Sequence, residues 1–405
     1  MLRKLSVVLL IVVGVLLTGV VAADDDPIKI GCLLGLTGGL APYGPSIADG
    51  AQMAIDNINA AGGVLGRQLE LLVRDSGTSA DVGRDAASKL IEIDGVQAIV
   101  GALSSGVTVA VSSVTIPAEV VLISPASTAP TVTALDDNDF VFRTVVADTV
   151  QGVVLGRLAV IQNYKNVSVV YVNNDYGKGL ADTFKATFEA LGGMVTAMVP
   201  LEELKPSYRG EVDIAMIGDP DAIMMACYPV DGNKIIVEAV EVGYTGDFLL
   251  TDGMKGESVA PGIACPSAEA GGVLEGSYGT VAARGFKADQ FEADYTAGGY
   301  GPTTIPYHDK AYDAVMVIAL AMVKSGETSS IAIRDNLRAV ANPPGELVYY
   351  DEWEKAIALL QAGKEINYQG AAGLVDFKDS GDVDGSIEIW KIEGCEIVKV
   401  MEVAG

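Results

Sequence analysis

The sequence predicts an α/β protein made of two doubly wound parallel-sheet lobes. Short apolar runs alternate with segments of helical spacing along most of the chain, which is typical of parallel strands joined by helices. The alternation restarts near residues 141–147, where we expect a second sheet to begin. A chain of 405 residues is also too long for a single core and suits two.

The first 23 residues are predicted to be a secretory signal peptide. Residues 1–4 form a basic start, an apolar run follows, and residues 21–23 (Val-Ala-Ala) resemble a cleavage site before three aspartates. An uncleaved membrane anchor is the alternative, because the apolar run is nearly long enough to span a bilayer. We therefore expect a periplasmic or extracellular protein.

The first series of elements begins at residue 28. A strand over residues 28–34 leads through a Gly-rich loop, residues 37–45, into a helix. Residues 46–49 (Ser-Ile-Ala-Asp) resemble a capping box for this helix, and the glycines at 62–63 end it. The next elements expected are a strand over 69–74, a helix over 79–92 and a strand over 96–100.

The second series repeats this architecture without a matching sequence repeat. Its expected elements are a helix over 150–163, a strand over 167–172, a turn at 173–177, a helix over 179–191, strands over 222–227 and 248–250, and a helix over 234–242. Towards the C-terminus we expect an added helix over 352–361. Residues 374–389 are expected to form two strands around an acidic turn.

The net charge excludes two classes of partner. The chain carries −26 at pH 7, and about −28 without residues 1–23, which hold Arg3 and Lys4. Such a surface repels nucleic acid and anionic lipid headgroups, so we expect neither as a partner.

Four cysteines are spread along the chain without a CxxC or Cys/His cluster, so we expect no zinc site. They are Cys32, Cys227, Cys265 and Cys395. An exported protein meets an oxidising compartment in which disulfides form, and Cys227–Cys265 is the first pair to test. Buried free thiols are the open alternative.

Catalytic and metal-binding motifs are weak in this sequence. The chain has a single histidine, His308, and lacks both a G-x-S-x-G elbow and a phosphate-binding glycine loop. The aspartate-rich segment 376–385 does not fit the ligand spacing of an EF-hand calcium loop. We expect no enzyme activity, metal or cofactor, and a secreted hydrolase that uses His308 is the weaker hypothesis.

Two serine-bearing segments indicate an anion site. Residues 100–106 and 122–128 are apolar runs that break into small hydroxyl residues, as buried parallel strands do where they lead into helix N-termini. Such strand ends offer N–H groups and hydroxyls to a carboxylate. The candidate groups are the hydroxyls of Ser104, Ser105 and Thr128 and the N–H groups near Ala126.

The opposite charge has a candidate partner as well. Asp252 follows the predicted strand at 248–250 and can face an ammonium group. Tyrosines at predicted loop or strand ends can flank a cation or an aliphatic side chain. These are Tyr43, Tyr176, Tyr228 and Tyr307. Together the two sets of groups suit a zwitterion.

These residues stand in motifs by which residues 28–400 resemble the periplasmic substrate-binding proteins of branched-chain amino-acid ABC transporters. The most specific stretches are residues 28–38, 43–44, 58–63 (Ile-Asn-Ala-Ala-Gly-Gly), 100–105, 123–128 (Ile-Ser-Pro-Ala-Ser-Thr), 174–177 (Asn-Asp-Tyr-Gly) and 311–314. The resemblance implies the type I periplasmic binding fold, in which the chain crosses three times between the lobes.

The resemblance also implies domain boundaries. It places the crossovers near Ala147, Tyr278 and Gly381. Lobe 1 is then formed by residues 24–147 plus 278–380, and lobe 2 by residues 148–277 plus 381–405.

Ligand contacts follow from the same resemblance. Ser105, Ala126 and Thr128 match the family's carboxylate site, and Asp252 stands at the ammonium site where many relatives carry glutamate. The aspartate is one methylene shorter, which implies a deeper ligand or an intervening water. The family's aromatic wall corresponds to Tyr43, Tyr176, Tyr228 and Tyr307.

The function implied by the resemblance is capture of an amino acid by hinge closure and delivery to an ABC permease. The amino acid would be a branched-chain or similar aliphatic zwitterion, and the protein a monomer that meets the membrane through the permease or an uncleaved anchor. A ligand sensor of the same fold, for an amino acid or small amide and feeding a receptor or regulator, is the alternative.

Overall fold

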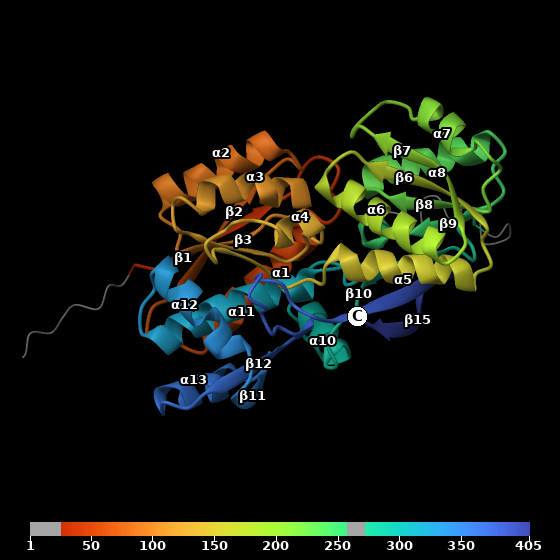
Figure 1. Ribbon diagram of the computed structural model, residues 1–405. Coiled ribbons are helices and arrows are strands. Elements are labelled where there is room, and N and C mark those ends of the chain that lie inside the picture. The colour runs from red at the N-terminus through yellow and green to blue at the C-terminus, as the bar shows by residue number, and fades with distance from the viewer. Residues whose placement is uncertain (1–25, 257–271) are drawn as a thin grey trace, which may run out of the picture.

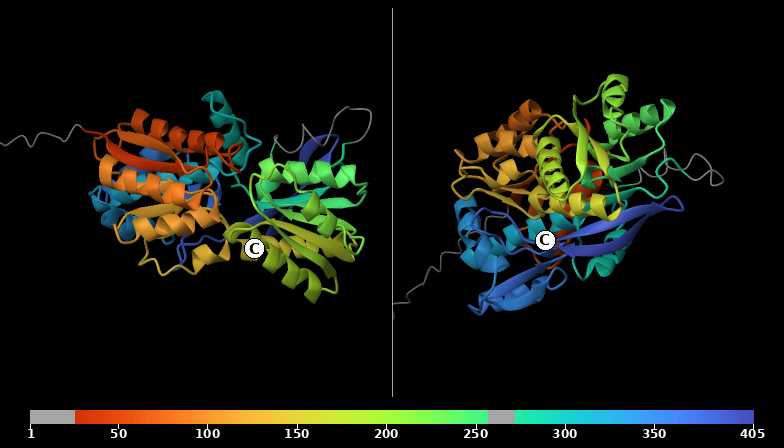
Figure 2. Two further views of the ribbon diagram at one scale, coloured as in Figure 1. Left: turned by 90° about the horizontal axis from the view of Figure 1, so that it is seen from above. Right: turned by 45° about the vertical axis from the view of Figure 1, so that its right-hand side comes forward.

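The computed structural model describes residues 26–256 and 272–405, so the predicted signal peptide lies outside the described residues. Two lobes lie side by side, one drawn mainly in red and orange and the other mainly in green (Figures 1 and 2). Each lobe contains a twisted sheet with helices packed on it, which confirms the predicted α/β class. We define lobe 1 and lobe 2 by these two sheets.

The sheet of lobe 1 is entirely parallel, with strand order β2-β1-β3-β4-β5. Its strands are β1 (Ile28–Leu34), β2 (Leu69–Asp75), β3 (Ala98–Gly101), β4 (Val121–Ser124) and β5 (Val141–Arg143). Both faces are covered, and alternate residues of β1 point into different hydrophobic cores. This explains why the strands are continuous apolar runs in the sequence.

Helices cover both faces of this sheet. One face carries α1 (Gly44–Ala60), α11 (His308–Ser325) and α12 (Ser330–Ala341), and the other carries α2 (Ala80–Lys89), its π-helical continuation η1 (Leu90–Asp94) and α3 (Ser105–Thr115). The short α4 (Pro130–Thr133) and α10 (Ala288–Ala297) complete the lobe. The predicted end of α1 is confirmed, because Gly62 and Gly63 adopt φ of 103° and 79° directly after its C-cap, Ala61.

The sheet of lobe 2 is mixed, with strand order β15-β14-β10-β9-β8-β6-β7. Five strands are parallel: β6 (Asn166–Val172), β7 (Met194–Leu201), β8 (Ala222–Ala226), β9 (Asp247–Leu250) and β10 (Tyr278–Ala282). The C-terminal hairpin of β14 (Ser386–Glu393) and β15 (Glu396–Ala404) adds two antiparallel strands. The second lobe is therefore the predicted parallel-sheet lobe with an antiparallel hairpin added at this edge, where a tight turn replaces a helical crossover.

Helices also pack on both faces of the second sheet. One layer consists of α5 (Asp148–Ile161) and α6 (Asp175–Ala190), and the other of α7 (Arg209–Ala215) and α8 (Pro229–Glu241). A one-turn 3-10 helix, η2 (Asp252–Met254), follows β9 at the carboxyl end of that strand.

Three crossovers join the lobes, as the resemblance implies. They lie between β5 and α5, between β10 and α10, and before β14, where the Gly381 carbonyl accepts a bond from the Arg143 N–H at 3.0 Å. The boundary expected at Tyr278 is too early, because residues 278–282 form β10 and pair with β9 and β14. The chain leaves lobe 2 after Ala282. The apolar pattern of residues 278–282 indicates a strand, but it does not indicate which sheet the strand joins.

A small inserted unit packs on α11 and α12 at the outer end of lobe 1 (Figure 1). The helix expected over 352–361 is present as α13 (Trp353–Gln361). It lies beside a sheet of β11 (Glu346–Tyr349), β12 (Ile366–Gly370) and β13 (Gly373–Leu374). The two strands expected within 374–389 are reduced to Leu374 at the end of β13, a single bridge between Phe377 and Val383, and the start of β14.

The capping box expected at residues 46–49 is wrong. Helix α1 begins at Gly44 with Pro45 in its first turn, where the missing N–H of proline costs nothing. Ser46 instead donates to the carbonyl of Pro302 at 3.0 Å, and Asp49 accepts from the N–H of Gly301 at 3.0 Å. Both polar side chains therefore hold α1 to the loop before α11.

The pair Cys227–Cys265, the first disulfide to test, does not form, and the open alternative of a buried free thiol is confirmed for Cys227. Cys227 is a buried free thiol whose sulfur lies 3.6 Å from the carbonyl oxygen of Val170, and Cys32 is likewise free and buried. Cys395 is disulfide-bonded, and Cys265 lies outside the described residues.

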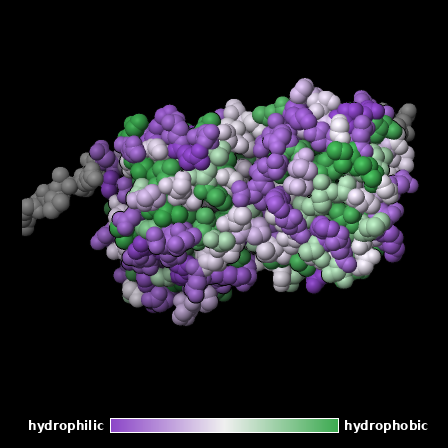
Figure 3. All heavy atoms as spheres, turned by 45° about the horizontal axis from the view of Figure 1, so that its top comes forward, coloured by the Kyte–Doolittle hydropathy of each residue, from purple (hydrophilic) through white to green (hydrophobic). Residues whose placement is uncertain are grey.

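Within the described ranges, no single helix combines the length and the apolar character needed to cross a membrane. Only α11 and α12 taken together meet both criteria, and their axes differ by 102°. On the face shown in Figure 3, hydrophobic residues form small groups separated by polar ones over both lobes.

Candidate functional site

A cavity lies between the lobes, at the carboxyl ends of strands from both sheets. We call it the cleft cavity. It is lined by Leu40, Tyr43, Ile47, Leu103, Ser105, Ala126, Tyr176, Tyr228, Asp252, Gly253 and Tyr307. The structure thus brings seven of the nine candidate ligand residues to one cavity; Ser104 and Thr128 bond to groups beside it and do not line it.

One end of the cleft cavity offers donors for an anion. Ser105 is the first residue of α3, whose first-turn N–H groups have no intrahelical acceptor. The Ser104 hydroxyl does not cap these groups; it accepts a bond from the Tyr228 hydroxyl of lobe 2 at 3.1 Å. The N-terminus of α3 therefore keeps its partial positive charge for a carboxylate.

The second serine-bearing segment lies beside this helix end. The N–H of Ala126 points to the Ser124 hydroxyl at 3.3 Å, and the Ser105 hydroxyl accepts from the N–H of Ala129 at 3.2 Å. The Thr128 hydroxyl differs from the expectation, because it donates to Asp148 Oδ2 at 3.0 Å. Its direct contact with a ligand stays a prediction.

The same cavity carries a buried carboxylate without a cation. Asp252 is 4% exposed and accepts bonds at 2.8 Å from Gln151 Nε2, the Tyr176 hydroxyl and the Tyr307 hydroxyl. Burial raises its pKa, and these three donors only partly offset that rise. No Lys, Arg or His of the described residues forms an ion pair with Asp252, so this charge is unbalanced.

Asp148 and Gln151 lie next to Asp252 without lining the cavity, and they were not among the sequence candidates. Asp148 is fully buried, and burial together with the nearby charge of Asp252 raises its pKa well above the ordinary value. Asp148 Oδ1 and Gln151 Oε1 are buried acceptors that have no hydrogen-bond partner in the described structure. In the sequence, an acidic residue at the start of a helix is explained by its favourable interaction with the helix dipole. That explanation gave no reason to expect Asp148 beside Asp252.

Tyrosines from both lobes close the cavity. The rings of Tyr176 and Tyr228 stack with centroids 5.5 Å apart and planes at 9°. Tyr43 of lobe 1 donates to the Lys255 carbonyl of lobe 2 at 2.6 Å. Together with the bond from Tyr228 to Ser104, these contacts hold the lobes in a closed arrangement.

Tyr307 reaches the cavity from an unusual backbone conformation. Its φ is 82°, in the left-handed region that bulky residues rarely adopt, and it stands directly before α11. This conformation delivers the Tyr307 hydroxyl to Asp252 Oδ2. The bond to a buried carboxylate helps to maintain the strained backbone.

His308, the single histidine, is engaged elsewhere. Its Nδ1 lies 2.9 Å from the Ile305 carbonyl oxygen, its Nε2 lies 3.1 Å from Glu292 Oε1, and its ring packs on Tyr295. Among the described residues, no serine hydroxyl forms a hydrogen bond with His308. The contacts therefore give no support to a catalytic triad built on this residue.

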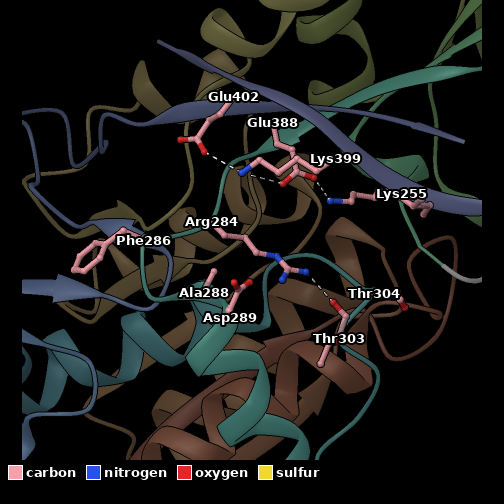
Figure 4. A pocket seen from close by; sticks show the side chains of 12 residues that line it. Lys255, Arg284, Phe286, Ala288, Asp289, Thr303, Thr304, Glu388, Lys399 and Glu402 are labelled. Atoms are coloured by element: carbon pink, nitrogen blue, oxygen red, sulfur yellow. Dashed lines mark hydrogen bonds and ion pairs between the residues drawn. The ribbon is translucent and has the colours of Figure 1, made fainter. Parts of the chain in front are cut away.

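A second interlobe pocket lies beside the crossover between β10 and α10, and we call it the hinge pocket (Figure 4). It is lined by Lys255, Arg284, Gly285, Phe286, Ala288, Asp289, Thr303, Thr304, Glu388, Ile397, Lys399 and Glu402. Figure 4 shows Lys255, Glu388 and Lys399 on one side of this space, with Arg284 projecting into it from the other.

Each cation of the hinge pocket has a carboxylate partner. Lys255 pairs with Glu388 at 2.6 Å, Arg284 with Glu292 at 2.7 Å and Lys399 with Glu402 at 3.1 Å. Within the described chain, three or more potential metal ligands do not cluster anywhere.

Known proteins share both the sequence pattern and the architecture. Residues 27–358 match the family model described as periplasmic binding protein. The Leu/Ile/Val-binding protein BraC3 of Rhizobium johnstonii is 29% identical over 383 residues, covering 92% of this chain and 93% of that protein. The chemotactic signal transduction system substrate-binding protein BasB of Halobacterium salinarum is 29% identical over 360 residues, covering 87% and 83%.

Solved structures agree in fold. The leucine-binding protein LivK of Thermotoga maritima superposes with a TM-score of 0.77 at 25% identity, covering 93% of this chain and 99% of that one. LivJ of Streptococcus pneumoniae, in complex with isoleucine, superposes with the same score at 24% identity, covering 94% and 99%. The family model spans most of the chain, and both lobes have the expected topology. This chain therefore belongs to the periplasmic binding protein family.

Proposed function

We propose that this protein is an extracytoplasmic solute-binding protein that captures an aliphatic amino acid and delivers it to an ABC permease. The observation that carries the proposal is the charge pattern of the cleft cavity. The start of α3, with its free N–H groups, and the unbalanced carboxylate of Asp252 both belong to the wall of this cavity. An α-amino acid carries the complementary pair of charges.

Capture follows from closure of the lobes. In the open protein, the start of α3 with Ser105 and Ala126 holds the ligand carboxylate on lobe 1. Lobe 2 then brings Asp252 to the ammonium group, and the stacked rings of Tyr176 and Tyr228 exclude water. Exclusion of water strengthens both charge interactions, and no covalent step is needed.

The walls of the cavity favour an aliphatic ligand side chain. Leu40, Ile47 and Leu103 supply apolar surface from lobe 1, facing the tyrosine rings. Such a lining with few polar anchors is typical of small-molecule sites. The relative named for binding leucine, isoleucine and valine supports the same ligand class.

Location and partner belong to the same proposal. A signal peptide at residues 1–23 would export the chain, and the closed form would be the one that a permease recognises. We propose that the exported protein is a monomer whose only route to the membrane is the permease or an uncleaved anchor.

A ligand sensor is the second candidate function. The relative named as a chemotactic substrate-binding protein favours it, because the same cavity could report an amino acid or small amide to a receptor. Loss of leucine uptake on deletion of the gene would support transport. Normal uptake with a lost behavioural or transcriptional response would support sensing.

The ligand class is tested by a thermal-shift screen of the purified mature protein. Leucine, isoleucine and valine should each raise the melting temperature, since a ligand at 100 times its dissociation constant adds about 2.7 kcal/mol of stability. Neutral amides and simple amines, which lack one of the two charges, should not. Shifts with amides or amines alone would overturn the proposed ligand class.

A further inference from the structure

Glu203 lies where the rims of the two lobes meet. It belongs to the loop between β7 and α7 of lobe 2, and its carboxylate rests against the backbone of Gly39 in lobe 1. A Cβ atom added to Gly39 would lie only 2.6 Å from Glu203 Oε2 and 3.0 Å from the ring of Tyr228. Lobe 1 therefore covers this carboxylate in part, since Glu203 is half-buried, and it does so only while the lobes are closed.

The surroundings of Glu203 do not balance its charge. Asn174 Nδ2, next to α6, lies 3.4 Å from Oε1, and no basic residue of the described chain forms an ion pair with Glu203. The charged groups that face it are Asp231 of α8 and Glu202 of the same loop, both acidic. Lys234 of α8 pairs with Asp231 at 3.6 Å instead. The facing segment of lobe 1, residues 36–42, has no titratable side chain.

We infer that Glu203 links closure of the cleft to the uptake of a proton, so that ionised Glu203 weakens ligand capture. This inference rests on the proposed function, since closure is the step that captures the ligand. The ionised carboxylate loses water when Gly39 covers it and gains no cation in return. Protonated Glu203 is uncharged and avoids this cost of removing a charge from water.

The direction of the effect follows from the pKa of Glu203. Burial, with repulsion from Asp231 and Glu202, raises this pKa to about 7 in the closed protein. In the open protein, where water reaches the carboxylate, an ordinary value of about 4.3 applies. Because the closed form holds the proton more tightly, affinity is greatest in acid, falls as pH rises towards 7 and levels off above it. The expected loss between pH 5 and pH 8 is on the order of 50-fold.

The test compares leucine affinity by calorimetry at pH 5, 6, 7 and 8 for the wild type, Glu203→Gln and Glu241→Gln. Glu241 is an exposed acid at the end of α8, and its substitution removes the same charge at a position away from the cleft. We expect Glu203→Gln to flatten the pH dependence and to bind tighter at pH 8, with the control like the wild type. Asp252 and Asp148 are present in all three proteins, so a difference between the proteins in how affinity depends on pH is due to Glu203. Equal slopes in all three proteins would overturn the inference.

Failure of the proposed function would be distinguishable. If leucine did not bind the wild type at any pH, the ligand assignment would be at fault and closure would be measured directly. Small-angle X-ray scattering of the unliganded proteins at pH 8 should then give a smaller radius of gyration for Glu203→Gln than for the wild type and the control. Identical radii would overturn the proton linkage itself.

Discussion

The cleft cavity and the hinge pocket both lie between the lobes, yet they treat charge in opposite ways. In the hinge pocket, the ammonium group of Lys255 meets Glu388 at 2.6 Å, and the other cations are paired as well. The cleft cavity is lined by Asp252, with Asp148 buried close behind it, and neither carboxylate forms an ion pair within the described residues.

This difference in charge balance distinguishes a ligand-binding site from a structural contact between the lobes. A charge that the protein balances internally supports the fold, and removing one partner leaves the other exposed to the cost of burial. A charge that the protein leaves unbalanced weakens the empty closed form and is available to a ligand of opposite charge. Matched substitutions in the two regions should therefore damage different properties.

The largest effect is expected for Asp252→Asn, which removes the unbalanced charge and keeps the shape of the side chain. Affinity for leucine should fall by about 2–5 kcal/mol, the typical cost of losing one partner of a desolvated charge pair. The melting temperature of the unliganded protein should stay the same or rise, because a buried charge disappears. Calorimetry and thermal unfolding measure the two quantities, and unchanged affinity would remove Asp252 from the ammonium role.

The matched change in the hinge pocket is Glu388→Gln. It leaves Lys255, which is 8% exposed, without its carboxylate, so the free energy of unfolding should fall by about 1–3 kcal/mol while leucine affinity changes little. Adding Lys255→Met should restore part of the loss in denaturant unfolding. If Glu388→Gln instead lost much of its leucine affinity and kept normal stability, the hinge pocket would not differ from the cleft cavity in the way proposed.

Tyr228→Phe should have a smaller effect on the cleft cavity. The substitution keeps the ring stacked on Tyr176 but removes the hydroxyl that bridges to Ser104 of lobe 1. One interlobe hydrogen bond is worth about 0.5–1.5 kcal/mol, so leucine should bind a few-fold more weakly. Tyr244→Phe, which loses a bond to the Asp247 carbonyl within lobe 2, is the control and should keep full affinity.

The smallest effect is expected for Lys399→Gln at the rim of the hinge pocket. The Lys399 side chain is 52% exposed, and its ion pair with Glu402 is screened by water and salt. The melting temperature and the leucine affinity should both stay near wild type, within about 0.5 kcal/mol. A loss of stability as large as that of Glu388→Gln would show that solvent exposure does not determine how much these ion pairs contribute to stability.

Much of the cleft cavity was predictable because parallel sheets collect strand ends at one edge. Ser105, Ala126 and Asp252 each follow a short buried strand, and the apolar runs mark where those strands end. Three of the four tyrosines stand directly before a helix, and Tyr176 lies in the first turn of α6. Local sequence pattern therefore suffices to bring these residues to one edge of each sheet.

The remaining features depend on tertiary contacts that periodicity does not record. Ser46 looks like a helix cap, but its partner is Pro302, more than 250 residues away. The partner strands of residues 278–282 and the acceptor beneath the Cys227 thiol also lie outside the local sequence, tens of residues away or more. Asp148 was missed because its significance comes from the proximity of Asp252 in the folded chain.

The position of Asp148 has a mechanical consequence. It directly follows the first crossover, where its N–H donates to the Thr128 carbonyl at 2.8 Å while the Thr128 hydroxyl donates to its side chain. In a rotation about the crossovers, atoms close to the pivot have a short lever arm and move least, whereas atoms at the rim sweep the longest arc. The carboxyl group of Asp148 at the pivot is thus nearly stationary while the rim moves, so rotation of the lobes leaves its bonds to Thr128 in place.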